Sequence, residues 1–379
     1  MNRALLSALL ISFINVFITA CSPAASPSTG MGQLLDGNAQ GYTPVTPNVS
    51  LQFPADHMAH NDFRQEWWYL TANLETESKE QVGLQWTQFR IALSPPSAPP
   101  AQQADRALLA NSAIDRSPWQ TKQLYMSHTA VTSKSSHKAE EKWSRGHQSI
   151  TGTQAEPLTI RQDDWQWRSQ SKQLFPATLN VASSDFSYQL QLDTTAPFQL
   201  QGDNGYSVKN AAGSVASYYY SQPFITVTGS LVRDGKREKV SGHAWLDREW
   251  SSQFLSKTQQ GWDWFAIRLD STSTLMLFQL RDDTGDQSHF YSGRRMYQDG
   301  RGHNISNQQI TMTATAWQQT PSGRYPVQWH IQIPSENIDI TTTPLNNDSS
   351  MPLSIPYWEG PIDISGTHNG TGYMELTGY

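Results

Sequence analysis

The sequence predicts an all-β protein organised as two related β domains. Short segments of alternating apolar and polar residues, rich in β-branched and aromatic side chains, recur along most of the chain, as is typical of strands. No segment has a sustained apolar period of 3.6 residues, so long helices are not expected. The letters EWWYLTANL followed by QWTQFR are similar to DWFAIRL followed by LFQLR, which indicates a weak internal repeat. Many short strands joined by turns form a sandwich or a barrel.

The expected strands begin at residue 66 and continue to the end of the sequence. They cover residues 66–76, 81–93, 177–183, 186–194, 223–232, 261–270, 273–283, 308–318, 325–334 and 372–379. Asp234-Gly235 favours a hairpin turn, and the polar stretch 133–148 is expected to be a long loop. The 379 residues are enough for two domains, which we place at 51–250 and 251–379.

The N-terminus has the pattern of a secretion signal. The apolar run 4–18 is too short for a membrane span and leads into the letters ITAC, which resemble a bacterial lipobox. We expect a signal peptide at 1–20, a lipid on Cys21 and a flexible tether at 21–50 that is rich in Ser, Pro and Gly. Ser22 favours, by resemblance to Gram-negative lipoproteins, an outer-membrane location facing the periplasm. The alternative is a signal without lipidation, in which Cys21 is incidental.

Composition excludes several functional classes. The formal net charge is −6 and basic residues form no stripe, so nucleic acid is not an expected partner. Cys21 is the single cysteine, which leaves no disulfide and no catalytic thiol. His57 and His60 lack an evident third metal ligand. The sequence has no G-x-S-x-G, H-E-x-x-H, P-loop or dinucleotide-binding pattern, so a serine-triad hydrolase is poorly supported.

Several blocks of the sequence occur in the order found in one protein family. They read AHNDFRQEWWYLTANL, SHTAVT, GDNGYSVK, SYYYSQPFITVTGSL, GHAWLDREWSSQ, GWDWFAIRL and YWEGPIDISG with GTGYMELTGY. They resemble the AttH / carotenoid 1,2-hydratase (hydroxyneurosporene synthase-like) family, whose secreted members are often labelled predicted hydrolases. The resemblance runs from about residue 54 to the C-terminus.

The resemblance implies two lipocalin-like antiparallel β-barrels in tandem, with no metal and no organic cofactor. Some family members add water to an isolated terminal double bond of a carotenoid. Related fungal members hydrate other prenyl groups or shape pericyclic cyclisations. The bacterial lipoprotein branch is often linked with ABC-transporter components, which makes such a system a possible partner here.

The stretch SGHAWLDREWSSQ, residues 241–253, places chemically active side chains on one face of a strand. At period two, one face holds His243, Trp245, Asp247 and Glu249, and the other holds Ala244, Leu246, Arg248 and Trp250. One face of a barrel strand points into the lumen, so either set can line the interior. A purely structural lumen favours the second set, and a reactive lumen favours the first.

Asp247 is the candidate proton donor. Burial beside a second carboxyl would raise the pKa of at least one acid and keep it protonated near neutral pH. Such an acid can protonate an alkene or an acetal oxygen. The family resemblance implies this role for Asp247, and His243 with Glu66 or Glu249 would assist. The alternative is an ion network of Asp247, Arg248 and Glu249 that fixes the seam between two domains.

Glu66 has two interpretations. It shares a strand face with Trp68 and could line the same cavity as Asp247, and a Glu–Asp pair also suits glycoside hydrolysis. Alternatively, Glu66 bonds Arg64 or Arg248 at the closed end of a barrel, where lipocalin-like proteins often pack Trp against Arg.

Aromatic residues supply the candidate ligand-binding positions, with ordinary core packing as the alternative. These positions are Trp68, Trp245, Trp262, Trp264, Tyr218 and Tyr220. The expected function is that of a lipid-anchored envelope protein that binds a prenyl- or lipid-like molecule, with acid chemistry as an extension. The alternatives are a true hydratase or hydrolase of that ligand, and a carbohydrate-binding or glycoside-cleaving module. An enclosed apolar cavity around Asp247 fits the first two, and an open groove with exposed Trp faces fits the third.

Overall fold

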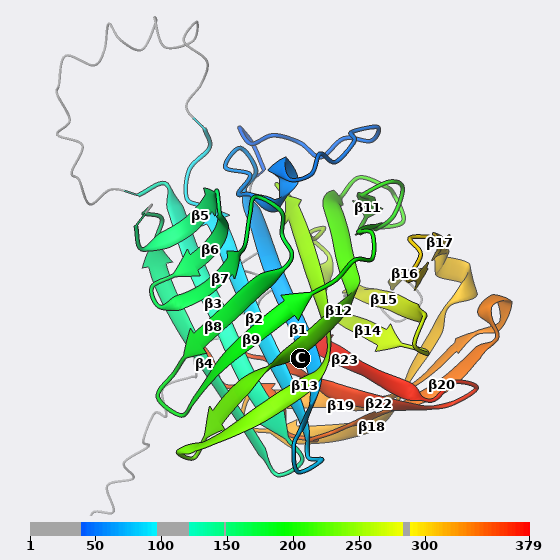
Figure 1. Ribbon diagram of the computed structural model, residues 1–379. Coiled ribbons are helices and arrows are strands. Elements are labelled where there is room, and N and C mark those ends of the chain that lie inside the picture. The colour runs from blue at the N-terminus through cyan, green and yellow to red at the C-terminus, as the bar shows by residue number, and fades with distance from the viewer. Residues whose placement is uncertain (1–38, 97–120, 148, 283–288) are drawn as a thin grey trace, which may run out of the picture.

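The protein is built from two antiparallel sheets, which confirms the predicted all-β class (Figure 1). The computed structural model describes residues 39–96, 121–147, 149–282 and 289–379. The sheets curl into barrel and half-barrel forms, as in tandem lipocalin-like barrels. The expected signal peptide, the lipidation site Cys21 and most of the expected tether lie outside the described residues.

Helical structure in the described residues is limited to short 3-10 turns. These are η1 (Ala55–His57), η3 (Asn307–Gln309) and η4 (Pro334–Glu336). None of the described helices is long and apolar enough to cross a membrane.

The larger sheet has 13 strands within the described residues. In chain order they are β1 (Gln65–Thr76), β2 (Gln81–Ala92), β3 (Gln123–Ser133), β4 (Ser136–Arg145), β5 (Thr151–Ala155), β6 (Leu158–Gln162), β7 (Trp165–Ser169), β8 (Ala177–Ala182), β9 (Phe186–Asp193), β10 (Gln199–Leu200), β11 (Tyr206–Val208), β12 (Ala216–Arg233) and β13 (Lys236–Ser251). The spatial order is β4-β3-β2-β1-β13-β12-β9-β8-β7-β6-β5, and β10 and β11 also pair with β12.

The smaller sheet has ten strands within the described residues. They are β14 (Gln259–Arg268), β15 (Ser273–Asp282), β16 (Phe290–Tyr297), β17 (Gly302–Ile305), β18 (Thr311–Thr320), β19 (Gly323–Ile333), β20 (Ile338–Pro344), β21 (Ser350–Met351), β22 (Tyr357–Gly366) and β23 (Gly370–Leu376). The spatial order is β17-β16-β15-β14-β23-β22-β20-β19-β18, and β21 pairs with β22.

Two local sequence predictions have opposite outcomes. Asp234 and Gly235 both have positive φ and join β12 to β13 in a tight hairpin, as predicted. The prediction of a loop at 133–148 is wrong, because residues 136–145 form β4. This strand pairs with a neighbour on one side only and its side chains are half-buried or exposed, so its polar sequence suits an edge of the sheet.

The interior of the larger sheet is lined by the β13 face that holds Ala244, Leu246 and Arg248. Ala244 and Leu246 belong to the same buried cluster as Trp68 and Leu70 of β1. Arg248 is the charged member of this set, and its guanidinium carbon lies 3.9 Å from the centre of the Trp68 ring. The other face of β13, which holds His243, Trp245, Asp247 and Glu249, therefore points away from this interior.

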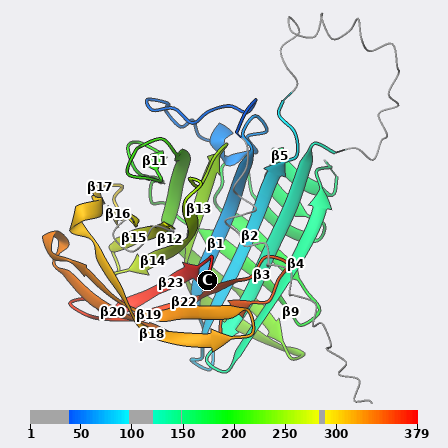
Figure 2. The same ribbon diagram turned by 180° about the vertical axis from the view of Figure 1, so that it is seen from behind.

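The outward faces of β1 and β13 pack against the smaller sheet and form what we call the intersheet core. It includes Trp67, Tyr69 and Trp245 of the larger sheet and Trp262 and Trp264 of the smaller one. Both views show β14 and β23 beside β1 and β13 (Figures 1 and 2), and β1 contacts β23.

The two sheets approach each other closely at Gly83 in β2. A Cβ atom at this position would lie 2.5 Å from Cγ of Pro361 in β22 and 2.9 Å from the Tyr373 hydroxyl. Glycine is therefore required by the space between the sheets at this position.

Candidate functional site

A cavity lies in the intersheet core, between the two sheets. It measures about 50 Å³ for a water-sized molecule, and about 560 Å³ when the space that opens to solvent is counted. Aromatic rings from both sheets form most of its wall: Trp67, Tyr69, Phe89, Tyr219, Trp262 and Trp264. The charged or acidic groups in the wall are Lys209, Asp247, Glu249 and Glu375. Such a mainly apolar cavity with a few convergent polar groups is typical of ligand sites.

Asp247 is a buried acid at the wall of this cavity. The Tyr219 hydroxyl donates a hydrogen bond to Oδ2 at 2.6 Å, and Trp245 Nε1 donates one to Oδ1 at 2.7 Å. The Ser221 hydroxyl also donates to Oδ1. Burial outweighs these hydrogen bonds and raises the pKa of Asp247 to about 7, and the charge of Glu249 adds to the rise. Asp247 therefore exists in both protonation states near neutral pH.

Glu249, two residues later on the same strand face, is held by a cation. The Lys209 ammonium lies 2.6 Å from Glu249 Oε1, and the Ser217 hydroxyl donates to the same oxygen. Lys209 Nζ also lies 4.5 Å from the ring centre of Phe278 and 5.0 Å from that of Tyr219. The two acids of β13 thus have different surroundings, because one faces aromatic and neutral groups and the other an ammonium.

Glu375 of β23 supplies a third carboxyl to the cavity from the smaller sheet. Trp262 Nε1 donates a hydrogen bond to its Oε1 at 3.1 Å. Burial raises the pKa of Glu375 to about 8, and the charges of Asp247 and Glu249 add to the rise. Both sheets therefore present a carboxyl that is protonated in part or in full near neutral pH.

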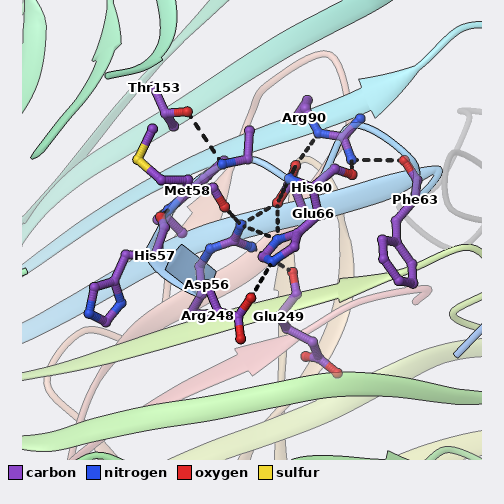
Figure 3. Close-up of polar contacts among 12 residues, drawn as sticks. Asp56, His57, Met58, His60, Phe63, Glu66, Arg90, Thr153, Arg248 and Glu249 are labelled. Carbon is purple, nitrogen blue, oxygen red and sulfur yellow. Dashed lines mark hydrogen bonds and ion pairs between the residues drawn. The ribbon is translucent and has the colours of Figure 1, made fainter. Parts of the chain in front are cut away.

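Glu66 lies outside this cavity, which corrects the prediction that it lines the same cavity as Asp247. It faces the opposite side of the larger sheet, where it is ion-paired with Arg90 and Arg248 (Figure 3). The backbone N–H of His60 also donates to Glu66 at 2.9 Å. Burial alone would raise the pKa of Glu66, but the two guanidinium groups hold it well below its usual range. This is the Trp–Arg arrangement given as the alternative interpretation, because Arg248 stacks on Trp68.

Three predicted ligand-binding residues also face away from the cavity. Trp68 lies in the interior of the larger sheet beneath Arg248. The Tyr218 hydroxyl donates to the Thr46 carbonyl at 3.0 Å, and the Tyr220 hydroxyl lies 2.6 Å from His57 Nδ1. Tyr218 and Tyr220 point the other way because side chains alternate along β12, and Tyr219 between them reaches the cavity.

The remaining predicted residues lie in the intersheet region. Trp262 and Trp264 form part of the cavity wall, and Trp245 holds Asp247 by its indole N–H. His243 is on the same strand face as Asp247 but four residues away, roughly 13 Å at 3.3 Å per residue. It lines a separate depression with Arg268, so the structure does not bring His243 and Asp247 together.

The described residues contain no group of three His, Cys, Asp or Glu side chains that could hold a metal ion. The two histidines of the H-x-x-H pattern have different partners. His57 contacts Tyr220, and His60 contacts Glu66 and Asp56.

The order of strands and the distribution of the sequence blocks match a known family. The AttH-like family model matches residues 44–379. This chain belongs to the AttH-like family. A solved structure assigned to AttH from Nitrosomonas europaea is 30% identical to it, with a TM-score of 0.75, and the match covers 89% of this chain and 99% of that one. A search of curated proteins finds no match to the chain.

The fold of this AttH-like protein is also found in a fungal enzyme. Kievitone hydratase from Nectria haematococca is 14% identical, with a TM-score of 0.65, and the match covers 89% of this chain and 96% of that one. At this identity the likeness establishes the shared fold.

Tyr219, Lys209 and Glu375 are among the cavity residues of this AttH-like protein that the sequence-based candidates lacked. The sequence-based candidates included Tyr218 and Tyr220 but not Tyr219, which lies between them. The three differ only in the face of β12 that each side chain occupies. Lys209 lies outside any regular strand pattern, just after β11. Glu375 shares a face of β23 with Tyr373, two residues earlier, and this period of two was the available signal for its side of the strand.

Proposed function

We propose that this protein adds water to a carbon–carbon double bond of an apolar, isoprenoid-like molecule, or removes water in the reverse direction. Asp247 is the proton donor in this proposal. The observation that carries it is a buried carboxyl with a pKa of about 7 at the wall of an aromatic cavity. Such a group is protonated in part at neutral pH and has little solvent to compete for its proton.

In the first step, the Asp247 carboxyl gives its proton to the less substituted carbon of the double bond. A C–H bond forms, the π bond breaks and the other carbon becomes a carbocation. The faces of Trp262, Trp264 and the other rings of the wall are suited to stabilise this cation, because an aromatic face carries partial negative charge.

In the second step, water attacks the cation and loses a proton to Glu249. Glu249 is placed for this task because it lines the same cavity as Asp247, with Lys209 as its ion-pair partner. Asp247 and Glu249 are two residues apart on one strand face, roughly 7 Å, which leaves room for a water molecule between them. Return of the proton from Glu249 to Asp247 completes the cycle.

Two comparisons support the proposal. The chain belongs to the AttH-like family, and a protein that shares its fold is named kievitone hydratase. Neither the substrate nor the reaction of that protein is carried over. The proposal takes from it that this fold can contain a hydratase site.

The anchoring and location of the protein belong to the same proposal. A lipid on Cys21 would hold the protein on the envelope membrane. It would take no part in the chemistry, but it would bring the protein close to a supply of apolar substrate. Labelling of cells with an alkyne-tagged palmitate would test it, since Cys21→Ser should lose the label.

The function is tested with squalene and farnesol as probes in ¹⁸O-labelled water. We expect a product that carries one added labelled water, and its loss in Asp247→Asn and Glu249→Gln while quenching of tryptophan fluorescence by the probe persists. Binding without product in the native chain would favour a carrier of apolar molecules. If the native chain shows neither binding nor product, the proposal is overturned.

The glycoside-cleaving alternative is not proposed. It requires tryptophan faces open to solvent, whereas Trp245, Trp262 and Trp264 are 6%, 9% and 7% exposed.

A further inference from the structure

A second buried polar cluster lies beside the cavity and has no part in the steps above. It is centred on Glu359 of β22, which is the cross-strand partner of Glu375 in β23. Cβ atoms of directly opposed residues on one face are about 5 Å apart, so Glu359 and Glu375 are side-chain neighbours, and the charge of Glu375 acts on Glu359. Glu359 is 1% exposed and makes no ion pair within the described residues. A buried carboxyl without a cation is costly to ionise, so its presence calls for an explanation.

The contacts of Glu359 lead in two directions. Toward the cavity, the hydroxyl of the wall residue Tyr69 donates to Glu359 Oε1. Away from the cavity, Tyr357 lies two residues before Glu359 on the same strand face, and its hydroxyl interacts with the Glu359 carboxyl. The Tyr357 hydroxyl also lies 2.9 Å from Nδ1 of His128 in β3.

His128 continues this line toward the surface. It is fully buried, and its Nε2 lies 3.8 Å from Oε2 of Glu141 in β4. The side chain of Glu141 is 22% exposed, so it meets solvent. Two atoms along the line, Glu359 Oε2 and His128 Nε2, have no hydrogen-bond partner among the described residues. His128 Nε2 faces the next group in the line, Glu141, so a small side-chain movement can make that contact.

We propose that Glu375, Glu359, Tyr357, His128 and Glu141 form a proton path between the cavity and the protein surface. In the inward direction, Glu141 passes a proton to His128 Nε2, and His128 passes its Nδ1 proton to Tyr357. Tyr357 passes its own hydroxyl proton to Glu359, and Glu359 passes one to Glu375. Each of His128, Tyr357 and Glu359 gains one proton and loses one, so the cavity receives a proton. His128 is left with its proton on Nε2 instead of Nδ1, and return of the ring to the first tautomer resets the path.

The surroundings of Glu359 suit this role. The groups that face it are Tyr69 from β1, Tyr357 from its own strand, and Tyr373 and Glu375 from β23. None of them is a cation. Burial and the neighbouring Glu375 raise the pKa of Glu359, so this carboxyl holds a proton that it can pass on. Burial lowers the pKa of His128 to about 4, so the neutral imidazole has one nitrogen free to accept.

The path rests on the proposed function for its purpose, since the reaction recovers its own proton and the path would bring the buried cavity acids to their protonation equilibrium with solvent before turnover. The residues between Glu375 and the surface touch no substrate in that proposal, so they act as positioning and transfer groups. Their role can be measured without turnover, which keeps the two proposals separable.

The experiment follows hydrogen–deuterium exchange of the buried carboxyls by infrared spectroscopy in the full chain, with heavy water as the only probe. Glu359→Gln and Glu375→Gln assign the carboxyl bands. We expect His128→Phe to slow exchange of these bands at least about tenfold, which corresponds to a barrier roughly 1.4 kcal/mol higher. Tyr357→Phe, which deletes one oxygen atom, should slow exchange in the same way and serves if His128→Phe folds poorly.

His57→Phe is the matched control. His57 is also buried, has an unpartnered Nε2 and contacts a tyrosine hydroxyl through Nδ1, but it lies on the other side of the larger sheet. It should leave the exchange rate unchanged. A structural lesion would loosen packing and speed exchange, so unchanged or faster exchange in both His128→Phe and Tyr357→Phe would overturn the path. Slowed exchange in a chain that hydrates no alkene would retain the path and refute the hydratase.

Discussion

Two buried carboxyls of the larger sheet show how surroundings decide the chemistry of one functional group. Glu66 faces two guanidinium groups, so it stays ionised and structural. Asp247 faces hydroxyl, indole and aromatic groups, so burial raises its pKa to about 7. Among the described residues no cation pairs with Asp247, and this difference, more than burial itself, separates the two cases.

The pH dependence of turnover follows from Asp247. Because its protonated form is the active one in our proposal, hydration should proceed at pH 6 and decline as pH rises through about 7. The measurement is the initial rate of water addition to squalene between pH 5 and pH 9. A rate that increases across pH 7 would contradict the assignment of Asp247 as the acid.

Asp247 also affects stability. Its ordinary pKa of 3.8 is raised to about 7 in the folded protein, so its contribution to stability is complete below pH 3.8 and is lost as pH rises to about 7. The whole effect is roughly 4 kcal/mol. Asp247→Asn can keep the three hydrogen bonds if Tyr219 accepts instead of donating, so the variant should be more stable than the native chain at pH 8.

Urea unfolding at pH 5 and pH 8 provides the measurement. The difference in unfolding free energy between the variant and the native chain should grow with pH. Equal differences at the two pH values would show that Asp247 ionises normally in the folded protein.

At the scale of the strand, the sequence predicted which residues share a face, but not what packs against that face. The period of two in β13 correctly grouped His243, Trp245, Asp247 and Glu249 on one face. It did not say which face would line the interior, because that choice depends on what packs against each side. Sharing a face did not bring His243 and Asp247 together, because they are four residues apart along the strand and His243 lines a separate depression.

The ion network of Glu66 joins β1, β2 and β13, and its loss should destabilise the fold. Glu66→Gln would leave the buried guanidinium groups of Arg90 and Arg248 without a counter-charge, at a cost of about 3–5 kcal/mol. Because the pKa of Glu66 is held low, the native chain should lose this stabilisation as pH falls below the usual range of a glutamate. Urea unfolding of both chains at pH 7 provides the test. A difference in unfolding free energy under about 1 kcal/mol would contradict the prediction.

At the scale of the whole molecule, the sequence predicted the fold class and the family but not the position of the site. Composition, strand period and the quoted blocks were enough for two lipocalin-like sheets. The cavity lies between the sheets, and its wall combines residues as distant in sequence as Trp67 and Glu375. No local pattern encodes that contact, so Lys209, Tyr219 and Glu375 could be found only in the folded structure.

The close approach at Gly83 makes the contact between the sheets sensitive to one methyl group. Gly83→Ala would place a Cβ atom 2.5 Å from Pro361, and we expect a loss of about 1–3 kcal/mol in unfolding free energy. Pro361→Ala should recover part of this loss in the double variant, because it removes the obstructing ring atoms. Additive effects of the two changes would show that the sheets do not meet at this point.

The size of a cavity between two separate sheets depends on both sheets together and is set by neither alone. Substitutions in the interior around Trp68 change the packing of the larger sheet, while those at Gly83 and Pro361 change the spacing between the two sheets. Proteins with the same two sheets can therefore differ in the ligands they bind through small shifts of one sheet against the other, while every strand stays in place.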